Sequence, residues 1–230
     1  MARTLLIVGY GPGISRGLAE RFGKEGFAVA ICARNAGRLA EAAKALEAKG
    51  IAAGAFPADA ADPAQVRGAI EGARERFGPL GVLHWNAISG REVGDVLSAG
   101  EAAFAPLFDA AVRGLALAVR DALADLKAAG DGAVLVTNGA FGETSPQVDA
   151  FTVQMKAMGV GLANAAKHKL VGLLSERLKG EGVFVGEVMV AGAVKGTPFA
   201  GSAEGIDPGA IAEAFWKLYK DRTEIRARIA

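Results

Sequence analysis

The sequence contains very little cysteine, histidine and tyrosine, and these shortages exclude several kinds of site. Cys32 is the only cysteine among 230 residues, so the chain cannot close an internal disulfide. One cysteine and two histidines supply no cluster with metal-ligand spacing, and we expect no metal site. The sequence also shows no serine, histidine and aspartate set of the kind that hydrolases use. A disulfide scaffold, a metalloenzyme and a triad hydrolase are therefore not indicated.

The chain also lacks an excess of charge and long apolar runs. It has 26 lysine and arginine residues against 25 aspartate and glutamate residues, a balance that is not typical of nucleic-acid binding. No uninterrupted apolar run reaches the ~18 residues of a membrane span, and the beginning shows no secretory signal. We therefore expect a cytoplasmic protein that binds neither nucleic acid nor membrane. Because 51% of the residues are hydrophobic, residues 1–230 can form a single domain around one large core.

Short apolar runs alternate with helical patterns along the whole chain. Buried strands are predicted at residues 5–8, 27–33, 51–56, 80–85, 133–137 and 183–190. Helices are predicted at residues 13–25, 39–49, 63–77, 101–129, 151–178 and 208–219, with a further short strand at 224–229. Pro106 marks a candidate break in the helix at 101–129. This alternation predicts an α/β protein with a doubly wound parallel sheet (a Rossmann fold), arranged as three α/β/α layers.

A glycine-rich turn follows the first predicted strand and precedes the first predicted helix. Gly9, Gly11 and Gly13 stand within five residues, and Ile14 and Ser15 open the helix. Glycine lets the backbone turn tightly and approach a phosphate, and the helix N-terminus offers free N–H groups to its charge. A strand-to-helix turn without a ligand is the simpler interpretation, but this context favours a nucleotide site.

The whole chain resembles the short-chain dehydrogenase/reductases, which are single-domain NAD(P)-dependent oxidoreductases. The resemblance is carried by the glycine motif with Ser15 in place of its last glycine, by Asp59-Ala60, by Asn86-Ala87 after Trp85, by Ala191-Gly192 and by Thr197-Pro198. In the family, these segments lie against the cofactor. The resemblance therefore implies cofactor binding by Gly9, Gly11, Gly13, Ile14, Ser15, Arg34, Asn35, Asp59, Ala60, Asn86, Ala87 and Thr197.

The residues after the second predicted strand indicate which cofactor is used. In this fold an acid at that place binds the ribose 2′-hydroxyl, whereas an arginine accommodates a 2′-phosphate. The chain has Arg34 and Asn35 there, with Arg38 one helical turn later and no carboxylate nearby. A guanidinium binds phosphate through two parallel hydrogen bonds. NADP(H) is favoured over NAD(H), although Arg34 is also compatible with an ordinary solvated position.

The resemblance fails at the groups that carry the family's chemistry. The family uses a tyrosine as general acid, a lysine four residues later, a serine on the fifth strand and an asparagine in the preceding helix. Tyr10 and Tyr219 are the only tyrosines, and neither fits the tyrosine place. The serine place falls on Gly139 and the asparagine place near Ala111. Three of the four expected groups are missing.

The tyrosine and lysine places allow three alignments. They fall on Thr152 and Lys156, on Val160 and Asn164, or on Ala163 and Lys167. The second alignment preserves the helix length and is slightly preferred for the fold. Only the first retains both a hydroxyl and an ammonium, so Thr152 and Lys156 are candidate catalytic residues, although a threonine is a poor proton donor. Asn138, beside the lost serine, is a third candidate, able to bind a substrate carbonyl.

Four other polar residues are candidates to replace the missing catalytic groups. His84 ends the fourth predicted strand and is more often a packing histidine than a proton relay. Thr137 ends the fifth, where α/β sheets bind ligands. Ser145 lies in a loop, and His168 belongs to a basic run that is expected to face solvent or a subunit partner.

Two functions are consistent with this pattern. The first is a divergent NADP(H)-dependent oxidoreductase that acts by hydride transfer on a small carbonyl or activated alkene. The alternative is a non-catalytic NADP(H)-binding redox sensor or interaction protein, since the fold alone cannot decide. The enoyl-reductase branch of the family, which also has a serine in its first loop, is a minor alternative. The resemblance further implies a homodimer or homotetramer that pairs the two long helices.

Overall fold

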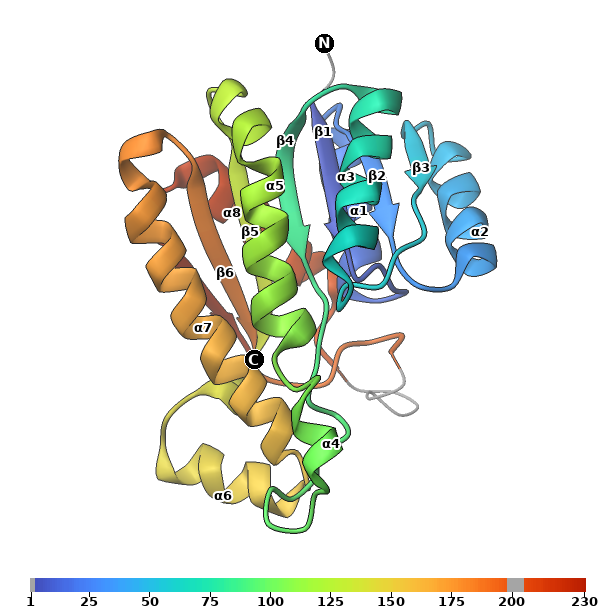
Figure 1. Ribbon diagram of the computed structural model, residues 1–230. Coiled ribbons are helices and arrows are strands. Elements are labelled where there is room, and N and C mark those ends of the chain that lie inside the picture. Colours follow the sequence, from blue (N-terminus) through green and yellow to red (C-terminus); the bar gives the residue numbers. More distant parts are fainter. Residues whose placement is uncertain (1–2, 198–204) are drawn as a thin grey trace.

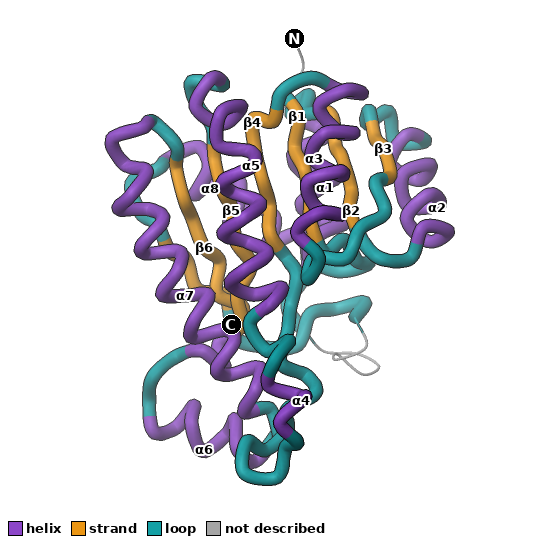
Figure 2. The backbone as a smooth tube through the Cα atoms, viewed as in Figure 1, coloured by secondary structure: helices purple, strands orange, loops and turns teal. Residues whose placement is uncertain are grey.

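The computed structural model describes residues 3–197 and 205–230, and its centre is a seven-stranded parallel sheet (Figures 1 and 2). The strands are β1 (Thr4–Val8), β2 (Ala28–Cys32), β3 (Ala53–Ala55), β4 (Leu80–Trp85), β5 (Ala133–Gly139), β6 (Phe184–Val190) and β7 (Arg226–Ile229). Their order in the sheet is β3-β2-β1-β4-β5-β6-β7, and every neighbouring pair is parallel. The doubly wound Rossmann fold is thereby confirmed.

Helices cover both faces of the sheet. The longer ones are α1 (Ile14–Lys24), α2 (Ala36–Glu47), α3 (Pro63–Phe77), α5 (Leu115–Ala128), α6 (Pro146–Gln154), α7 (Met158–Leu178) and α8 (Pro208–Asp221). Shorter turns are α4 (Glu101–Phe104), the π-helix η1 (Asp109–Gly114), and the 3-10 turns η2 (Ala140–Gly142) and η3 (Lys179–Glu181). In Figures 1 and 2, α3, α5 and α7 lie in front of the sheet, and α1 and α8 lie behind it.

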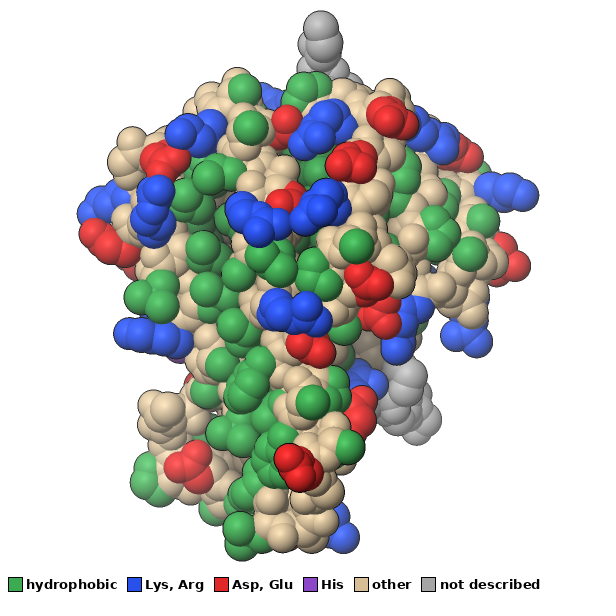
Figure 3. Space-filling model, viewed as in Figure 1, with side chains coloured by type: hydrophobic (Ala, Val, Ile, Leu, Met, Phe, Trp, Pro, Cys, Tyr) green, Lys and Arg blue, Asp and Glu red, His purple; other side chains and the backbone are tan. Residues whose placement is uncertain are grey.

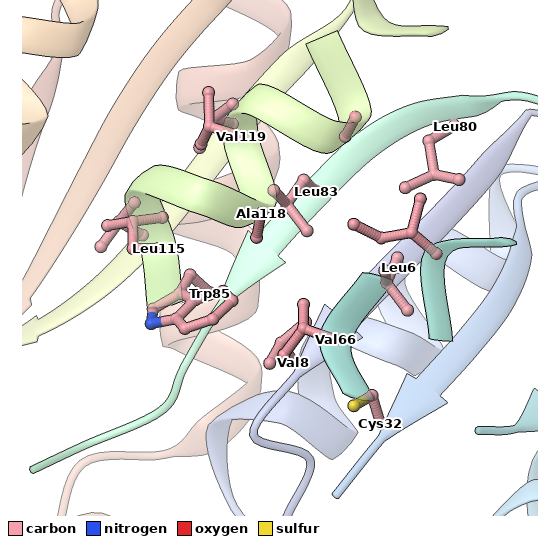
Figure 4. Close-up of a cluster of buried hydrophobic side chains, with 14 of the residues drawn as sticks. Leu6, Val8, Cys32, Val66, Leu80, Leu83, Trp85, Leu115, Ala118 and Val119 are labelled. Atoms are coloured by element: carbon pink, nitrogen blue, oxygen red, sulfur yellow. The ribbon is translucent and has the colours of Figure 1, made fainter. Parts of the chain in front are cut away.

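Each face of the sheet has its own apolar core because the strands alternate their side chains. Leu5 and Ile7 of β1 pack with α1, α2 and α8, whereas Leu6 and Val8 pack with α3, α5 and α7. Figure 4 shows part of the second cluster, where Trp85 lies beneath the start of α5. Trp85 is fully buried, and its indole Nε1 donates a hydrogen bond to the Ala110 carbonyl of η1 at 3.0 Å. This tryptophan therefore anchors the π-helix to the sheet.

The predicted helix at residues 151–178 is wrong, because the structure divides it into α6 and α7. Lys156, between them, has a left-handed backbone with φ of 50°. The first amides of α7 are taken by the loop that follows β4, since Met158 N–H donates to Gly94 and Gly159 N–H donates to Val93. A loop distant in sequence thus decides where α7 begins.

The helix at residues 101–129 is interrupted at the candidate break near Pro106, between α4 and η1, and continues as α5. By length and hydropathy alone, Glu101–Ala128 resembles a membrane span, with a mean hydropathy of 1.6 over its most apolar 18 residues, of which 39% are buried. The search for uninterrupted apolar runs in the sequence did not find this segment, because polar residues interrupt it. In the fold, Leu115, Val119 and Leu126 of this segment are buried in the core against the sheet.

The carboxyl ends of the strands meet along one edge of the sheet. Val8 of β1 is level with Trp85 of β4, and Trp85 is level with Val136 of β5. The chain order reverses between β1 and β4, which is the place where open α/β sheets bind their ligands. The glycine-rich turn after β1 lies at this point.

Candidate functional site

Two glycines of the glycine-rich turn, Gly9 and Gly13, stand where neighbouring chain segments leave no room for a side chain. Gly9 has φ of +86°, and a Cβ on it would lie 2.6 Å from the Ala87 nitrogen. A Cβ on Gly13 would lie 2.6 Å from Cγ2 of Thr197, which brings the loop after β6 against the turn. Helix α1 begins at Ile14 with no side-chain cap, so its first-turn amides stay available to an anion. The turn therefore has the shape of a phosphate cradle.

The side chains of Ser15 and Asn86 hold the backbone of this turn in place. Asn86 Nδ2 donates to the Gly9 carbonyl at 2.9 Å and to Ser15 Oγ at 2.8 Å, and Ser15 Oγ donates to the same carbonyl at 3.1 Å. Ser15 is 1% exposed. The side chain of Ser15, which replaces a family glycine, thus binds the turn to Asn86, the residue that follows β4.

The residues expected at the adenosine end lie at the ends of β2 and β3. Arg34 and Arg38 are exposed, and the described part of the chain gives neither an ion-pair partner. Asn35 Oδ1 accepts the Arg38 N–H and caps α2, so its carbonyl is already used. Asp59 follows β3, where its Oδ1 accepts the Ala61 N–H. The chain after β2 therefore carries two guanidiniums for which the described residues give no ion-pair partner, and Asp59 follows the neighbouring strand β3.

Lys167 is the ammonium that the structure brings to this edge. It is 2% exposed, and within residues 3–197 and 205–230 its Nζ donates one hydrogen bond, at 3.4 Å, to the carbonyl of Ala87. Burial lowers the pKa of this ammonium from 10.5 to about 8, and the Glu187 carboxylate acts in the opposite direction. An ammonium has three protons to donate, so a buried one with one long bond has donors to spare for a ligand. Of the three alignments, the geometry favours the one that places Ala163 and Lys167.

The candidates Thr152 and Lys156 are corrected by the structure. Their spacing required one continuous helix, but α6 ends at Gln154 and Lys156 lies in the turn that follows. Thr152 Oγ1 donates to the Val148 carbonyl one turn earlier at 2.7 Å, and Lys156 is exposed. The hydroxyl and the ammonium therefore do not form a pair.

Asn138 is also corrected, because its side chain is fully used inside the protein. Its Nδ2 donates to the Asn164 carbonyl at 3.0 Å and to Glu187 Oε1 at 2.6 Å, and its Oδ1 accepts the Gly139 N–H. Asn138 is 2% exposed. It supports the end of β5 and the neighbouring turn of α7, and it has no donor left for a substrate.

The other polar candidates have structural roles. His84 is fully buried against Phe215, its Nε2 shares a hydrogen bond with Thr137 Oγ1 at 2.9 Å, and burial lowers its pKa to about 3. It is therefore neutral near pH 7 and does not carry the acidic second proton of an imidazolium. Ser145 Oγ accepts the Val148 N–H and caps α6. The tyrosine in the turn, Tyr10, packs with the core on the α1 side, opposite α7.

The sequence reasoning did not identify the buried carboxylate Glu187 on β6. His168 Nδ1 lies 2.6 Å from its Oε2, and Arg226 Nε lies 3.3 Å from the same oxygen. His168, expected to face solvent or a partner subunit, is instead half-buried against this carboxylate. Glu187 lies within an otherwise apolar predicted strand, and a lone acid in such a run is a usable sign of a buried ion pair.

The residues present fit a bound nicotinamide dinucleotide. The glycine cradle and the α1 amides suit its pyrophosphate, Arg34 suits a 2′-phosphate, and the spare donors of Lys167 suit ribose hydroxyls. Thr197 Oγ1 donates to the Val194 carbonyl and shapes the loop against the cradle. Pro198, the next residue of that motif, lies outside the described residues.

Comparisons with known proteins agree with this geometry. The family model described as short chain dehydrogenase matches residues 3–197. The chain is 27% identical over 171 residues to the 3-oxoacyl-(acyl-carrier-protein) reductase FabG of Staphylococcus aureus, which covers 74% of this chain and 69% of that protein. It is 30% identical over 122 residues to the (S)-acetoin-forming diacetyl reductase of Staphylococcus epidermidis, which covers 53% of this chain but only 47% of that protein. For a third relative, from Streptomyces violaceoruber, the match covers 30% of its length.

Solved structures share the fold over nearly the whole chain. An NADPH-bound short chain oxidoreductase from Pseudomonas aeruginosa, described as containing an atypical catalytic center, superposes with a TM-score of 0.83 at 22% identity, covering 99% of this chain and 94% of that one. A metagenomic short-chain oxidoreductase in complex with NADP gives 0.80 at 19% identity, covering 99% and 96%. These likenesses establish the fold.

Proposed function

The chain belongs to the short-chain dehydrogenase family, and on that premise we propose that it is an NADP(H)-dependent oxidoreductase acting on a small carbonyl compound. The observation that carries this proposal is the buried Lys167 ammonium beside Ala87, at the anchor of the glycine turn. The lowered pKa of this ammonium suits proton transfer near neutral pH, in addition to binding of the cofactor ribose. The non-catalytic alternative gains no support from the named relatives, which are reductases and dehydrogenases.

In this proposal, different residues of the chain bind the cofactor and transfer the proton. When bound, the cofactor supplies a hydride for the carbonyl carbon. The turn amides and Arg34 bind its phosphates, and Lys167 binds its ribose and holds a proton at Nζ. With a pKa of about 8, that ammonium is well suited to give its proton to the carbonyl oxygen near neutral pH. Lys167 thus takes over the proton transfer for which the family uses a tyrosine.

The substrate class follows from chemistry and from the relatives' names. The relatives described as 3-oxoacyl and diacetyl reductases both carry a ketone in the named substrate. A site whose proton comes from the buried Lys167 ammonium needs a substrate oxygen that accepts that proton. We therefore favour a small ketone over an activated alkene, in which the acceptor is carbon.

The choice of cofactor is tested by calorimetric titration with NADPH and NADH. We expect NADPH to bind at micromolar concentration and NADH much more weakly. The Arg34→Ala variant should bind NADPH at least tenfold more weakly, since it loses a charge-assisted pair to the 2′-phosphate, and should bind NADH unchanged. Arg120, exposed on α5, provides the matched control, and its alanine variant should bind like the wild type.

Failure would take one of two forms. Equal affinity for both nucleotides in wild type and Arg34→Ala would contradict the role of Arg34 while leaving the site intact. No binding of either nucleotide would overturn the proposed function altogether.

We also propose that the chain forms a homodimer or homotetramer through α5 and α7. Figure 3 shows hydrophobic side chains along the front of the molecule, over these helices. Leu162 and Leu173 of α7 are 46% and 57% exposed, and their spacing of three helical turns puts them on one face. Sedimentation analysis should find an oligomer that Leu173→Glu weakens or dissociates. A wild-type monomer over the whole accessible concentration range would contradict this assembly.

A further inference from the structure

Asn164 carries a buried side-chain amide that nothing in the described part of the chain binds. The residue lies on α7 and is 3% exposed. Buried amides are nearly always hydrogen-bonded, as that of Asn138 is. In the described residues, the side-chain atoms that are both sealed from solvent and unpaired are His84 Nδ1 and Asp131 Oδ1. The amide of Asn164 is therefore unpaired but still reachable, which is the condition of a donor kept for a ligand.

This amide lies against the last residue of β5. A Cβ built on Gly139 would stand 2.7 Å from Asn164 Nδ2. A side chain at position 139 would therefore occupy the space that the amide fills. Since Gly139 ends its strand at the carboxyl edge of the sheet, Asn164 Nδ2 lies at the edge where the glycine turn and Ala87 also lie.

The backbone around Asn164 is fixed, so the amide has a defined place. Asn138 Nδ2 holds the Asn164 carbonyl at 3.0 Å, and Gly142 lets η2 approach so closely that a Cβ there would stand 2.6 Å from the Ala165 nitrogen. Lys167 follows Asn164 by three residues, so the two side chains share one face of α7. One helix face thus presents a neutral hydrogen-bond donor and a proton-bearing ammonium.

We propose that Asn164 Nδ2 donates a hydrogen bond to the carbonyl oxygen of the substrate and stabilises the charge that develops on it. This inference rests on the proposed function and names the group that activates the ketone. As the carbonyl carbon accepts hydride, the π electron pair of the C=O bond moves onto oxygen. Asn164 stabilises that oxyanion, the oxygen takes the proton of the Lys167 ammonium to give the alcohol, and the neutral amine regains a proton from water.

The test compares three variants in steady-state reduction of a ketone that the wild type accepts from a panel of small diketones and 3-oxo esters. Asn164→Ala and the isosteric Asn164→Asp, which both lack the donor, should lower kcat about 100-fold. The double variant Gly139→Ser/Asn164→Ala should recover at least tenfold of that loss, because the vacated space then holds a hydroxyl donor. Glu176→Gln, exposed on the same helix, is the matched control and should retain wild-type rates.

Two further measurements separate this role from folding and from cofactor binding. Thermal unfolding and NADPH titration of Asn164→Ala should match the wild type within a few degrees and within twofold. Titration of the ketone into the NADP⁺-loaded protein, where no hydride can move, should show about tenfold weaker binding for Asn164→Ala.

The outcomes are distinct. Wild-type kcat in Asn164→Ala, or no recovery in a folded double variant, would overturn this inference and leave the proposed function standing. A wild-type protein that binds NADPH but reduces no ketone of the panel would overturn the proposed function, and this inference with it.

Discussion

Replacement of Lys167 by methionine is expected to lower kcat for ketone reduction by about 100-fold or more, because it removes the proton that the carbonyl oxygen needs. Methionine preserves the length and packing of a side chain that is 2% exposed. The variant should also bind NADPH about tenfold more weakly, since one donor to the ribose is lost. Steady-state kinetics and calorimetric titration measure the two effects separately.

The stability of this variant provides its control. Burial places the pKa of Lys167 in the folded protein, about 8, below its ordinary value of 10.5, so the unfolded chain binds this proton more tightly. The group therefore destabilises the fold below pH 8, and this cost is relieved as the pH rises from about 8 to 10.5. Lys167→Met lacks the cost and should melt at the same or a higher temperature at pH 7. Lys167→Arg, whose guanidinium holds its proton too firmly, should retain part of the NADPH affinity but not the activity.

The pH profile gives a second readout of the same group. In the wild type, reduction should slow as the pH rises through about 8, when the ammonium of Lys167 loses its proton. Alcohol oxidation should rise over the same interval, because it needs the neutral amine. Lys167→Met should lose both inflections. Unchanged kcat and an unchanged profile in that variant would show that another group transfers the proton.

Trp85→Ala is expected to destabilise the protein by about 3–5 kcal/mol, which is a large part of the stability of a typical domain. Trp85 is fully buried under the start of α5, and alanine would leave a cavity between sheet and helix (Figure 4). The loss also leaves the Ala110 carbonyl of the π-helix without its indole partner. Urea unfolding measures the change in free energy.

Two further substitutions separate these contributions. Trp85→Phe retains most of the apolar volume and removes only the hydrogen bond to Ala110, so it should cost about 1–3 kcal/mol. Leu97 is 93% exposed, and Leu97→Ala should change stability by no more than about 0.5 kcal/mol. A Trp85→Ala variant as stable as Leu97→Ala would mean that the tryptophan does not anchor η1 to the sheet.

The features that the sequence predicted correctly depend on short stretches of chain. Apolar runs of strand length, separated by helical patterns, were enough to predict the parallel sheet. A strand that is buried on both faces is a continuous apolar run, which can be recognised in each strand separately. The glycine turn was equally local, since Gly9 needs a positive φ and its neighbours follow a strand and open a helix. Even the missing tyrosine was evident, because only Tyr10 and Tyr219 were available.

Only the tertiary structure shows how the surroundings of Lys156, Asn164 and Lys167 differ, and it favours Lys167 without testing its role. Sequence spacing cannot show where one helix ends and the next begins, and here a separate helix, α6, lies between β5 and α7. The break between the two helices depends on Val93 and Gly94, which bind the first amides of α7 from some 60 residues earlier in the chain. The partners of a polar side chain are likewise set by packing, so the sequence could not reveal that Asn138 is occupied and that Asn164 is free within the described chain. Local patterns therefore determined the fold and the glycine turn, whereas long-range contacts decided which polar side chains are paired within the described chain.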